Sequence, residues 1–288
     1  MADPRIAAAA SFLLQSPPGE INDVLNDVRA IVPDDDALQE GLAHALEEYN
    51  VTQFITVPVP EQSHQVIISK AGQVSGEEGR YLDPRSHTTF LLDHIRLETS
   101  DPQPHEADEA SEASRAALET ATLAYIADHY AQGVASVFAT PDSPHKFTVQ
   151  IVANKYNPSN FWSGRWRSEY IVDLENGEVA GKVQIHVHYY ENGNVQLSAS
   201  HTPIINFPPN SSLPPATLAS KLLANIEEQE TNYQAQLNEA YHDLGEKTFK
   251  GLRRALPLTK QKIDWERVTG YKLGAELAAS KGGFSEEA

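Results

Sequence analysis

The chain has 288 residues, of which 40% are hydrophobic and 22% are charged, and 40 acidic side chains against 22 basic ones give a net charge of −18. This ordinary globular composition excludes wholesale disorder, and the acidic balance argues against a general nucleic-acid binder. The sequence contains no cysteine, which excludes disulfides, thiolate catalysis and cysteine metal sites and favours a reducing compartment.

The N-terminal part carries the patterns of three short helices. Residues 4–15 form the first, which ends at a proline pair, and residues 21–31 form the second. The third follows three aspartates that can cap it, and its apolar face includes Leu38 and Leu42. Because the connections are short, we expect an antiparallel helix bundle over residues 1–50.

The longest apolar run covers residues 6–14. Nine residues are too few to cross a bilayer, and the single Arg5 in front of them makes a poor signal peptide. The sequence therefore predicts a cytosolic protein without a transmembrane segment.

Residues 51–110 change to a period of two. Residues 51–59, 64–70 and 88–96 have the alternation of short strands and are separated by turn-rich segments. The stretch 100–108 (SDPQPHEAD) is polar, acidic and rich in proline, which predicts a linker or an exposed loop.

Residues 111–207 contain a helix and the clearest β segment of the chain. The helix is indicated by apolar residues at helical spacing around 118–130, and five alternating segments then follow one another. Two of their connections contain Asn-Gly, at 176–177 and 192–193, which is typical of two-residue hairpins. The pattern predicts an antiparallel sheet whose five strands span residues 133–140, 146–155, 165–174, 181–190 and 194–202.

A long amphipathic helix is predicted next, within residues 208–262. Its apolar stripe has a period near 3.6, two prolines precede it, and Pro257 ends it. About forty residues at ~1.5 Å each give a rod of about 60 Å, which we expect to lie across one face of the sheet. The fold class is therefore α+β. The stripe consists of Leu222, Ile226, Tyr233, Leu237, Tyr241, Leu244 and Leu252.

The charge is divided unevenly along the chain. Residues 1–244 carry 34 acidic and 13 basic side chains, whereas residues 245–288 carry 6 acidic and 9 basic ones. Favourable interaction with the helix dipole accounts for two or three of these bases, but not for all of them. We favour a local binding surface for an acidic partner.

The pair His186 and His188 is the first candidate for chemistry. Residues two apart on a strand share a face, so both imidazoles can reach one metal ion. A third ligand at a compatible spacing is not evident, which favours a hydrogen-bonded surface or interface pair over a metal site. The sequence contains no phosphate-binding loop, dinucleotide fingerprint, nucleophile elbow or zincin motif, so we expect neither an enzyme nor a cofactor.

A dense aromatic and basic cluster lies at the entry to the third sheet strand. It contains Trp162, Arg165, Trp166 and Arg167, residue types that dominate protein interfaces. An aromatic turn that anchors the core, with arginine stacked on tryptophan, explains the cluster equally well. A platform for single-stranded RNA is disfavoured by the acidic body.

Six stretches of the chain resemble the alpha subunit of the heterodimeric F-actin-capping protein family, in the same order and over nearly the whole length. They are residues 14–29 (LQSPPGEINDVLNDVR), 82–85 (LDPR), 100–104 (SDPQP), 160–168 (NFWSGRWRS), 182–196 (KVQIHVHYYENGNVQ) and 249–265 (FKGLRRALPLTKQKIDW).

The resemblance implies a fold and a function. It implies an N-terminal helix bundle, short strands, a five-stranded antiparallel sheet and a long helix across that sheet. It further implies a beta subunit of similar fold, with which the chain forms one ten-stranded sheet as an obligate heterodimer. The pair would cap the barbed end of actin filaments in the cytoplasm, at cortical actin structures, without nucleotide or catalysis.

The resemblance also implies the residues that contact actin. Lys250, Arg254 and Lys260 match the family's basic contacts, and Lys260 replaces the usual arginine, which removes the planar fork for bidentate pairing. Residues 263–288 would form the amphipathic C-terminal "tentacle" and its tail. The full expected set is Lys250, Arg254, Lys260, Lys262, Trp265, Arg267, Lys272, Leu273 and Leu277.

Two other interpretations of the sequence remain open at this point. One is a metal-dependent enzyme built around His186 and His188, and the other is an acidic scaffold whose basic tail binds phosphoinositides. Phosphoinositides and acidic regulators of the cap are also candidate partners under the capping interpretation. The six residues Trp162, Arg165, Trp166, Arg167, His186 and His188 are expected to serve a subunit interface or the structure.

Overall fold

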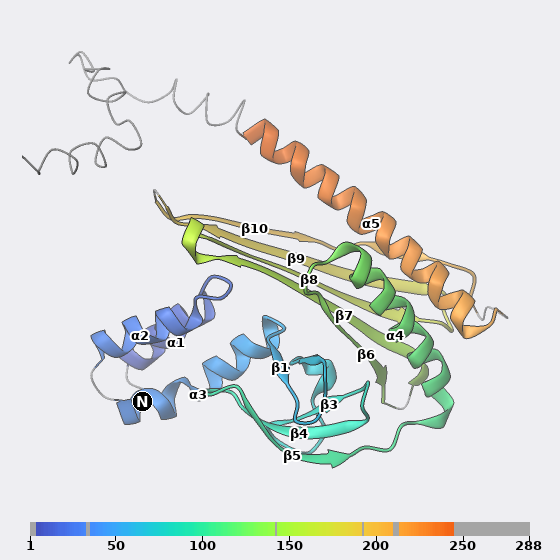
Figure 1. Ribbon diagram of the computed structural model, residues 1–288, viewed down its shortest axis with the longest axis horizontal. Coiled ribbons are helices and arrows are strands. Elements are labelled where there is room, and N and C mark those ends of the chain that lie inside the picture. Colours follow the sequence, from blue (N-terminus) through green and yellow to red (C-terminus); the bar gives the residue numbers. More distant parts are fainter. Residues whose placement is uncertain (1–3, 33–34, 142, 192, 210–212, 245–288) are drawn as a thin grey trace, which may run out of the picture. The chain divides into compact units, whose positions relative to one another are not determined.

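The computed structural model describes residues 4–32, 35–141, 143–191, 193–209 and 213–244 (Figure 1). The chain divides into two compact units, Met1–Tyr233 and Gln234–Ala288. The described part of the second unit is residues 234–244, which include the last residues of helix α5.

Three helices open the first unit, as the sequence predicts. Helices α1 (Pro4–Leu14) and α2 (Ile21–Ile31) pack with α3 (Asp35–Thr52) around a small apolar core. The third helix is longer than the period predicts, because it includes Val51, at which the sequence pattern predicts the start of the first strand. The buried side chain of Val51 packs with the small β-sheets that follow, so tertiary burial fixes its conformation.

Two small antiparallel sheets follow the helices. Strands β1 (Thr56–Pro58) and β2 (Gln65–Ile67) form one, and β3, β4 and β5 form the other. A 3-10 turn lies between them at Lys70–Gly72. The strands of the second sheet are β3 (Arg80–Asp83), β4 (Thr88–Asp93) and β5 (Glu98–Pro104).

Strand β5 corrects the expected loop over residues 100–104, whereas residues 105–108 belong to no helix or strand. Its residues pair with β4 in an antiparallel register, despite two prolines and an almost fully exposed pattern of side chains. Proline is tolerated on an edge strand, where one row of backbone N–H groups needs no partner. Composition alone therefore misread an edge strand as a loop.

The central sheet holds the five predicted strands in the order β10-β9-β8-β7-β6 (Figure 1). A sixth, short strand that we did not predict, β11 (Ile204–Asn206), pairs with the first half of β9. The five long strands are β6 (Val134–Thr140), β7 (Ser143–Asn157), β8 (Trp162–Asp173), β9 (Glu178–Tyr189) and β10 (Val195–His201).

Both connections that contain Asn-Gly are longer than the two-residue hairpins that the pattern predicts. Between β9 and β10, whose last pair is Tyr189 with Val195, five residues intervene, and Asn192 among them lies outside the described residues. Strand β8 ends at Asp173 and β9 begins at Glu178, so four residues connect them, and only Gly177 among them has a positive φ, +71°. The Asp173 carboxylate accepts the backbone N–H groups of Glu175 and Asn176 at 3.1 and 2.9 Å. This side-chain cap stabilises the longer loop.

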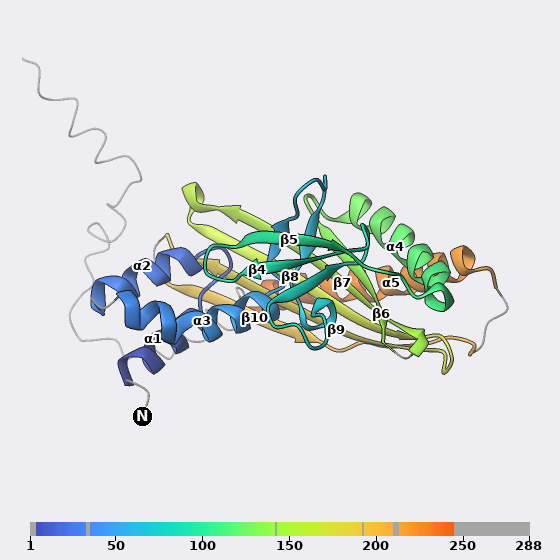
Figure 2. The ribbon, with the colours of Figure 1, turned by 90° about the horizontal axis from the view of Figure 1, so that it is seen from below.

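The two faces of the central sheet are covered differently. Helix α4 (Glu109–His129) and the part of α5 (Pro215–Asp243) up to Tyr233 lie over one face (Figure 1). The end of α3 and the small sheets lie against the other face, as the view from below shows (Figure 2). None of the helices in the described ranges is long and apolar enough to cross a membrane.

Candidate functional site

The predicted cluster on β8 is divided between the two faces of the sheet. Because side chains alternate along a strand, Arg165 and Arg167 point to the face below, and Trp166 points to the face covered by the helices. The cluster is therefore not one surface. It is two adjacent sets of contacts that share a strand.

Arg165 is buried and ties three elements together. Its Nε donates to the side-chain oxygen of Asn154 at 2.8 Å, and one terminal nitrogen donates to the Tyr156 hydroxyl at 2.7 Å. The other terminal nitrogen donates to Gln53, just beyond α3, at 3.4 Å. The guanidinium thus holds the end of α3 against β7 and β8.

Arg167 is also buried, with 8% exposure, but it is less well satisfied. One terminal nitrogen donates to the Thr52 carbonyl at the end of α3, while the enclosed Nε has no hydrogen-bond partner. Burial, followed by the neighbouring charge of Arg165, lowers the pKa of Arg167 to about 10. Within the described chain it forms no ion pair with a carboxylate.

Trp162 and Trp166 have different neighbours on the face covered by the helices. The Trp166 ring lies 6.0 Å from the ring of Tyr130 after α4 and 6.1 Å from that of Tyr233 in α5. Lys155 places its ammonium group 5.5 Å from the centre of the Trp162 ring. Both tryptophans are half-buried, and Trp166 is the one that contacts the aromatic rings of the covering helices.

His186 and His188 lie on the same face of β9, but each has its own partners. The Nε2 of His186 lies 3.1 Å from the Gln196 side-chain oxygen on β10. The Nδ1 of His188 lies 2.7 Å from the Glu20 carboxylate, which connects the central sheet to the start of α2. The described residues hold no cluster of three side chains suited to a metal ion. The hydrogen-bonded interpretation therefore fits this geometry.

Glu230 on α5, which the sequence pattern did not single out, has a carboxylate that the structure buries. The carboxylate accepts hydrogen bonds from the hydroxyl groups of Tyr125, Tyr130 and Tyr170, at 2.6 Å for Tyr125 and 2.7 Å for Tyr170. Burial raises the pKa of all three tyrosines, and the adjacent carboxylate raises it further. A signal was present in the sequence, since Glu230 follows Ile226 by four residues and so falls on the apolar stripe.

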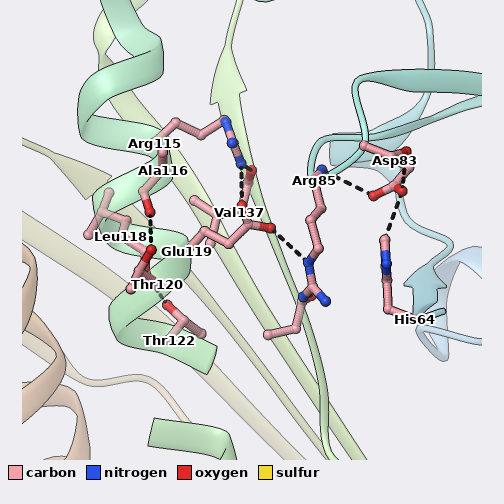
Figure 3. A network of polar contacts seen from close by, with 12 residues as sticks. His64, Asp83, Arg85, Arg115, Ala116, Leu118, Glu119, Thr120, Thr122 and Val137 are labelled. Atoms are coloured by element: carbon pink, nitrogen blue, oxygen red, sulfur yellow. Dashed lines mark hydrogen bonds and ion pairs between the residues drawn. The ribbon is translucent and has the colours of Figure 1, made fainter. Parts of the chain in front are cut away.

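A second network connects the small sheets to α4 (Figure 3). His64 contacts the Asp83 carboxylate at 2.9 Å, and Asp83 in turn accepts the Arg85 backbone N–H at 3.1 Å. The Arg85 side chain donates to Glu119 on α4 at 3.2 Å, and Arg115 donates to the other oxygen of that carboxylate at 3.1 Å. The LDPR stretch noted in the sequence therefore positions α4.

The nine residues that the resemblance implies for actin contact all lie outside the described residues. The structure places none of them. They are Lys250, Arg254, Lys260, Lys262, Trp265, Arg267, Lys272, Leu273 and Leu277.

These contacts define a class: α+β proteins in which two helices are fixed to one face of an antiparallel sheet by buried aromatic and polar contacts. A sequence profile of the family described as "F-actin capping protein alpha subunit" matches residues 9–276. The chain therefore belongs to the F-actin capping protein alpha subunit family.

Individual relatives agree with this assignment. An F-actin-capping protein subunit alpha from Gibberella zeae is 39% identical over 280 residues, covering 94% of this chain and 96% of the relative. The Caenorhabditis elegans subunit alpha is 38% identical over 280 residues, covering 95% and 97%. The Dictyostelium discoideum subunit is 35% identical over 279 residues, covering 94% and 97%.

A solved structure supports the fold. The homodimeric actin capping protein alpha subunit from Plasmodium berghei superposes with a TM-score of 0.68, covering 82% of this chain and 91% of that one. At 19% sequence identity, the similarity concerns the fold alone.

Proposed function

We propose that the chain is the alpha half of a heterodimer that caps the barbed end of actin filaments and blocks the addition and loss of subunits there. The observation that carries the proposal is the family match over residues 9–276, together with relatives named F-actin-capping protein subunit alpha. The cap works by binding, without nucleotide, cofactor or bond chemistry.

The free edge of the central sheet supports a partner chain. Strand β10 pairs with β9 on one side, and on its other side no strand of the described chain pairs with it. The side chain of Val195 on this edge strand is 60% exposed. An open, partly apolar edge strand is a template for another strand, and a beta subunit of similar fold would extend the sheet to ten strands.

The basic segment after residue 244 supports the contact with actin. A body with a charge of about −21 over residues 1–244 repels an acidic filament unless a local positive patch steers and anchors it. Lys250, Arg254 and Lys260 provide that patch in the proposal. Phosphoinositide headgroups and acidic regulators would compete for the same bases.

Seeded actin elongation tests the capping activity. The alpha and beta chains are co-expressed, and the purified pair is added to filament seeds in the presence of actin monomer. We expect barbed-end growth to stop, and we expect the variant with Lys250, Arg254 and Lys260 all changed to Glu to cap orders of magnitude more weakly while remaining heterodimeric. Full-rate elongation with the wild-type pair in excess would refute the function, and normal capping by the variant would refute the residue assignment.

Co-purification tests the partner. A tagged alpha chain is expected to retain a beta-type subunit in equal amount, and mass measurement in solution should give one copy of each. A stable homodimer or a soluble monomer of the alpha chain would contradict the obligate heterodimer.

A matched pair of edge variants links that result to β10. Changing Val195 and Leu197 to Asp should abolish retention of the beta subunit, because carboxylates would be buried in an apolar contact. Changing both to Ala keeps the strand apolar and should leave most of the retention intact.

A further inference from the structure

A hollow of about 430 Å³ lies between the end of α3 and the lower face of the central sheet. Its walls include Thr52 and Phe54 on one side and side chains of β8 and β9 on the other. This volume is within the range of small-ligand sites.

Three cations and one carboxylate line this hollow. The cations are Arg167 of β8, Lys182 of β9 and Lys70 of the 3-10 turn, and the carboxylate is Glu169 of β8. With one carboxylate among them, the local formal charge is +2 in a chain whose total charge is −18. The sign is therefore opposite to that of the body around it.

The strand register brings these groups together. Arg167 lies directly opposite Gln184, and Glu169 lies opposite Lys182, so Arg167 and Lys182 are diagonal neighbours on one face. Diagonal neighbours on antiparallel strands are within reach of long side chains. The Glu169 carboxylate is already bonded by the Gln150 amide at 2.6 Å, and no ion pair joins it to Arg167 or Lys182 in the described chain.

Arg167 is the buried cation of this hollow, and no carboxylate of the described residues forms an ion pair with it. It is more than nine-tenths buried, its contact is a neutral carbonyl, and its Nε is unsatisfied. Buried charges in proteins are ordinarily paired, because an isolated one carries a large desolvation cost. The neighbouring positive charge of Arg165 repels the Arg167 guanidinium.

We propose that this hollow is a binding site for a small soluble dianion of the phosphate class, held by Arg167 and Lys182 with Lys70 at the rim. A phosphate or phosphate monoester carries close to the two negative charges that the local excess requires, and arginine is well suited to hold its oxygens. Lys70 also borders a neighbouring hollow lined by Glu47, Glu77 and Glu78, so its contribution is the smallest of the three.

The site is separate from the basic C-terminal segment and does not rest on the capping proposal. All of its residues lie in the first unit, before residue 234. The experiment therefore uses the heterodimer where a beta subunit co-purifies, and the full-length chain as isolated where none does.

Thermal unfolding with inorganic phosphate is the primary measurement. Wild-type protein is titrated with phosphate and, separately, with sodium chloride at matched ionic strength, because screening alone stabilises an acidic protein. We expect a saturable rise in Tm beyond that given by chloride, and a matching saturable change in the ³¹P signal of phosphate.

The variant Lys70→Gln with Lys182→Gln removes two exposed cations without disturbing the buried arginine. It should weaken phosphate binding by about tenfold or more, since a charge-assisted hydrogen bond is worth at least that factor. Lys221→Gln, on the exposed face of α5, removes one lysine charge away from the hollow and should bind like the wild type. Circular dichroism confirms that all three proteins are folded.

Four outcomes decide the proposal. Equal phosphate effects in the three proteins, or no effect beyond chloride in the wild type, overturn it. A phosphate effect lost only in the double variant supports it. If phosphoinositide vesicles retain the wild type but not the double variant, while free phosphate competes them off, the same chemistry holds with a lipid headgroup as its source.

Discussion

Glu230 shows how much one side chain contributes to the position of a helix. It is 1% exposed, and its two carboxylate oxygens accept hydrogen bonds from tyrosine hydroxyl groups on α4, just after α4 and on β8. A buried carboxylate is tolerable only when hydrogen bonds replace its hydration, and three donors provide that here. The same three bonds fix the rotation of α5 against the sheet.

We expect Glu230→Gln to lower the free energy of unfolding by about 2 kcal/mol. The amide keeps the size of the carboxylate but turns one acceptor into a donor, so at least one tyrosine hydroxyl loses its acceptor. Urea unfolding measures the change. The control is Glu228→Gln, an exposed position two residues away, where the change should stay within about 0.5 kcal/mol.

His94 is held as a neutral ring by two partners. The Asn50 amide nitrogen donates to the His94 carbonyl at 2.9 Å, which fixes the orientation of the amide, and it also lies 3.2 Å from Nδ1. Nδ1 must then be an acceptor, so the proton resides on Nε2, which contacts the Tyr81 hydroxyl at 3.1 Å. Burial lowers the pKa of His94 below its ordinary value of 6.5.

The free energy of unfolding should therefore fall as the pH drops from about 7.5 to 5.5. The unfolded chain binds a proton at His94 near pH 6.5, whereas the folded chain resists it until a lower pH, so acidification favours unfolding. We expect the loss of stability between about pH 7.5 and 5.5, measured by urea unfolding, to be smaller in His94→Gln than in the wild type. An equal or steeper loss in the variant would exclude His94 as a contributor.

At the scale of elements, the loop between β8 and β9 depends on one glycine. Gly177 has a φ of +71°, and a Cβ atom there would overlap the Phe207 carbonyl oxygen and lie 2.8 Å from the Pro209 nitrogen. Both contacts are with backbone, which cannot move aside as a side chain can. The position is therefore constrained by conformation and by space together.

We expect Gly177→Ala to destabilise the protein by about 2–3 kcal/mol or to prevent folding. The matched control is Gly76→Ala, because Gly76 has a similar φ of +84° but no atom within 4 Å of the place that a Cβ would take. The control should lose about 1 kcal/mol, the conformational part alone. Equal losses in thermal unfolding would show that the close approach of the 207–209 backbone contributes nothing.

At the scale of the whole molecule, the separation of charge governs how the proposed cap meets its target. The acidic residues dominate up to residue 244, and the basic excess follows. Long-range attraction by a small cationic patch accelerates association, and salt screens it over about 8 Å at physiological ionic strength.

We expect the capping on-rate of the assembled pair to fall several-fold between about 50 and 200 mM salt, with a smaller change in the off-rate. The variant with Lys250, Arg254 and Lys260 changed to Glu should show a flat or inverted salt dependence. Elongation kinetics over this salt series measure both. A wild-type on-rate that is independent of salt would argue against electrostatic steering.

The sequence alone determined the fold class, the order of the helices and the five long strands of the central sheet. These elements have strong periodicity, which arises because one face of each is buried, and periodicity is visible in the letters. It also carried the family assignment, through stretches such as residues 160–168 and 182–196, which the profile over residues 9–276 confirms.

Only the tertiary structure decided which residues form contacts between different helices and strands. Strand β5 pairs as an edge although its composition is that of a loop, and Val51 belongs to a helix because neighbouring sheets bury it. Glu230 finds three hydroxyl groups that lie 60 to 105 residues away in the chain, and Arg167 meets the end of α3 from 115 residues away. Local patterns cannot encode such partners, because a polar group on an apolar face becomes an anchor only when folding brings its acceptors or donors to it.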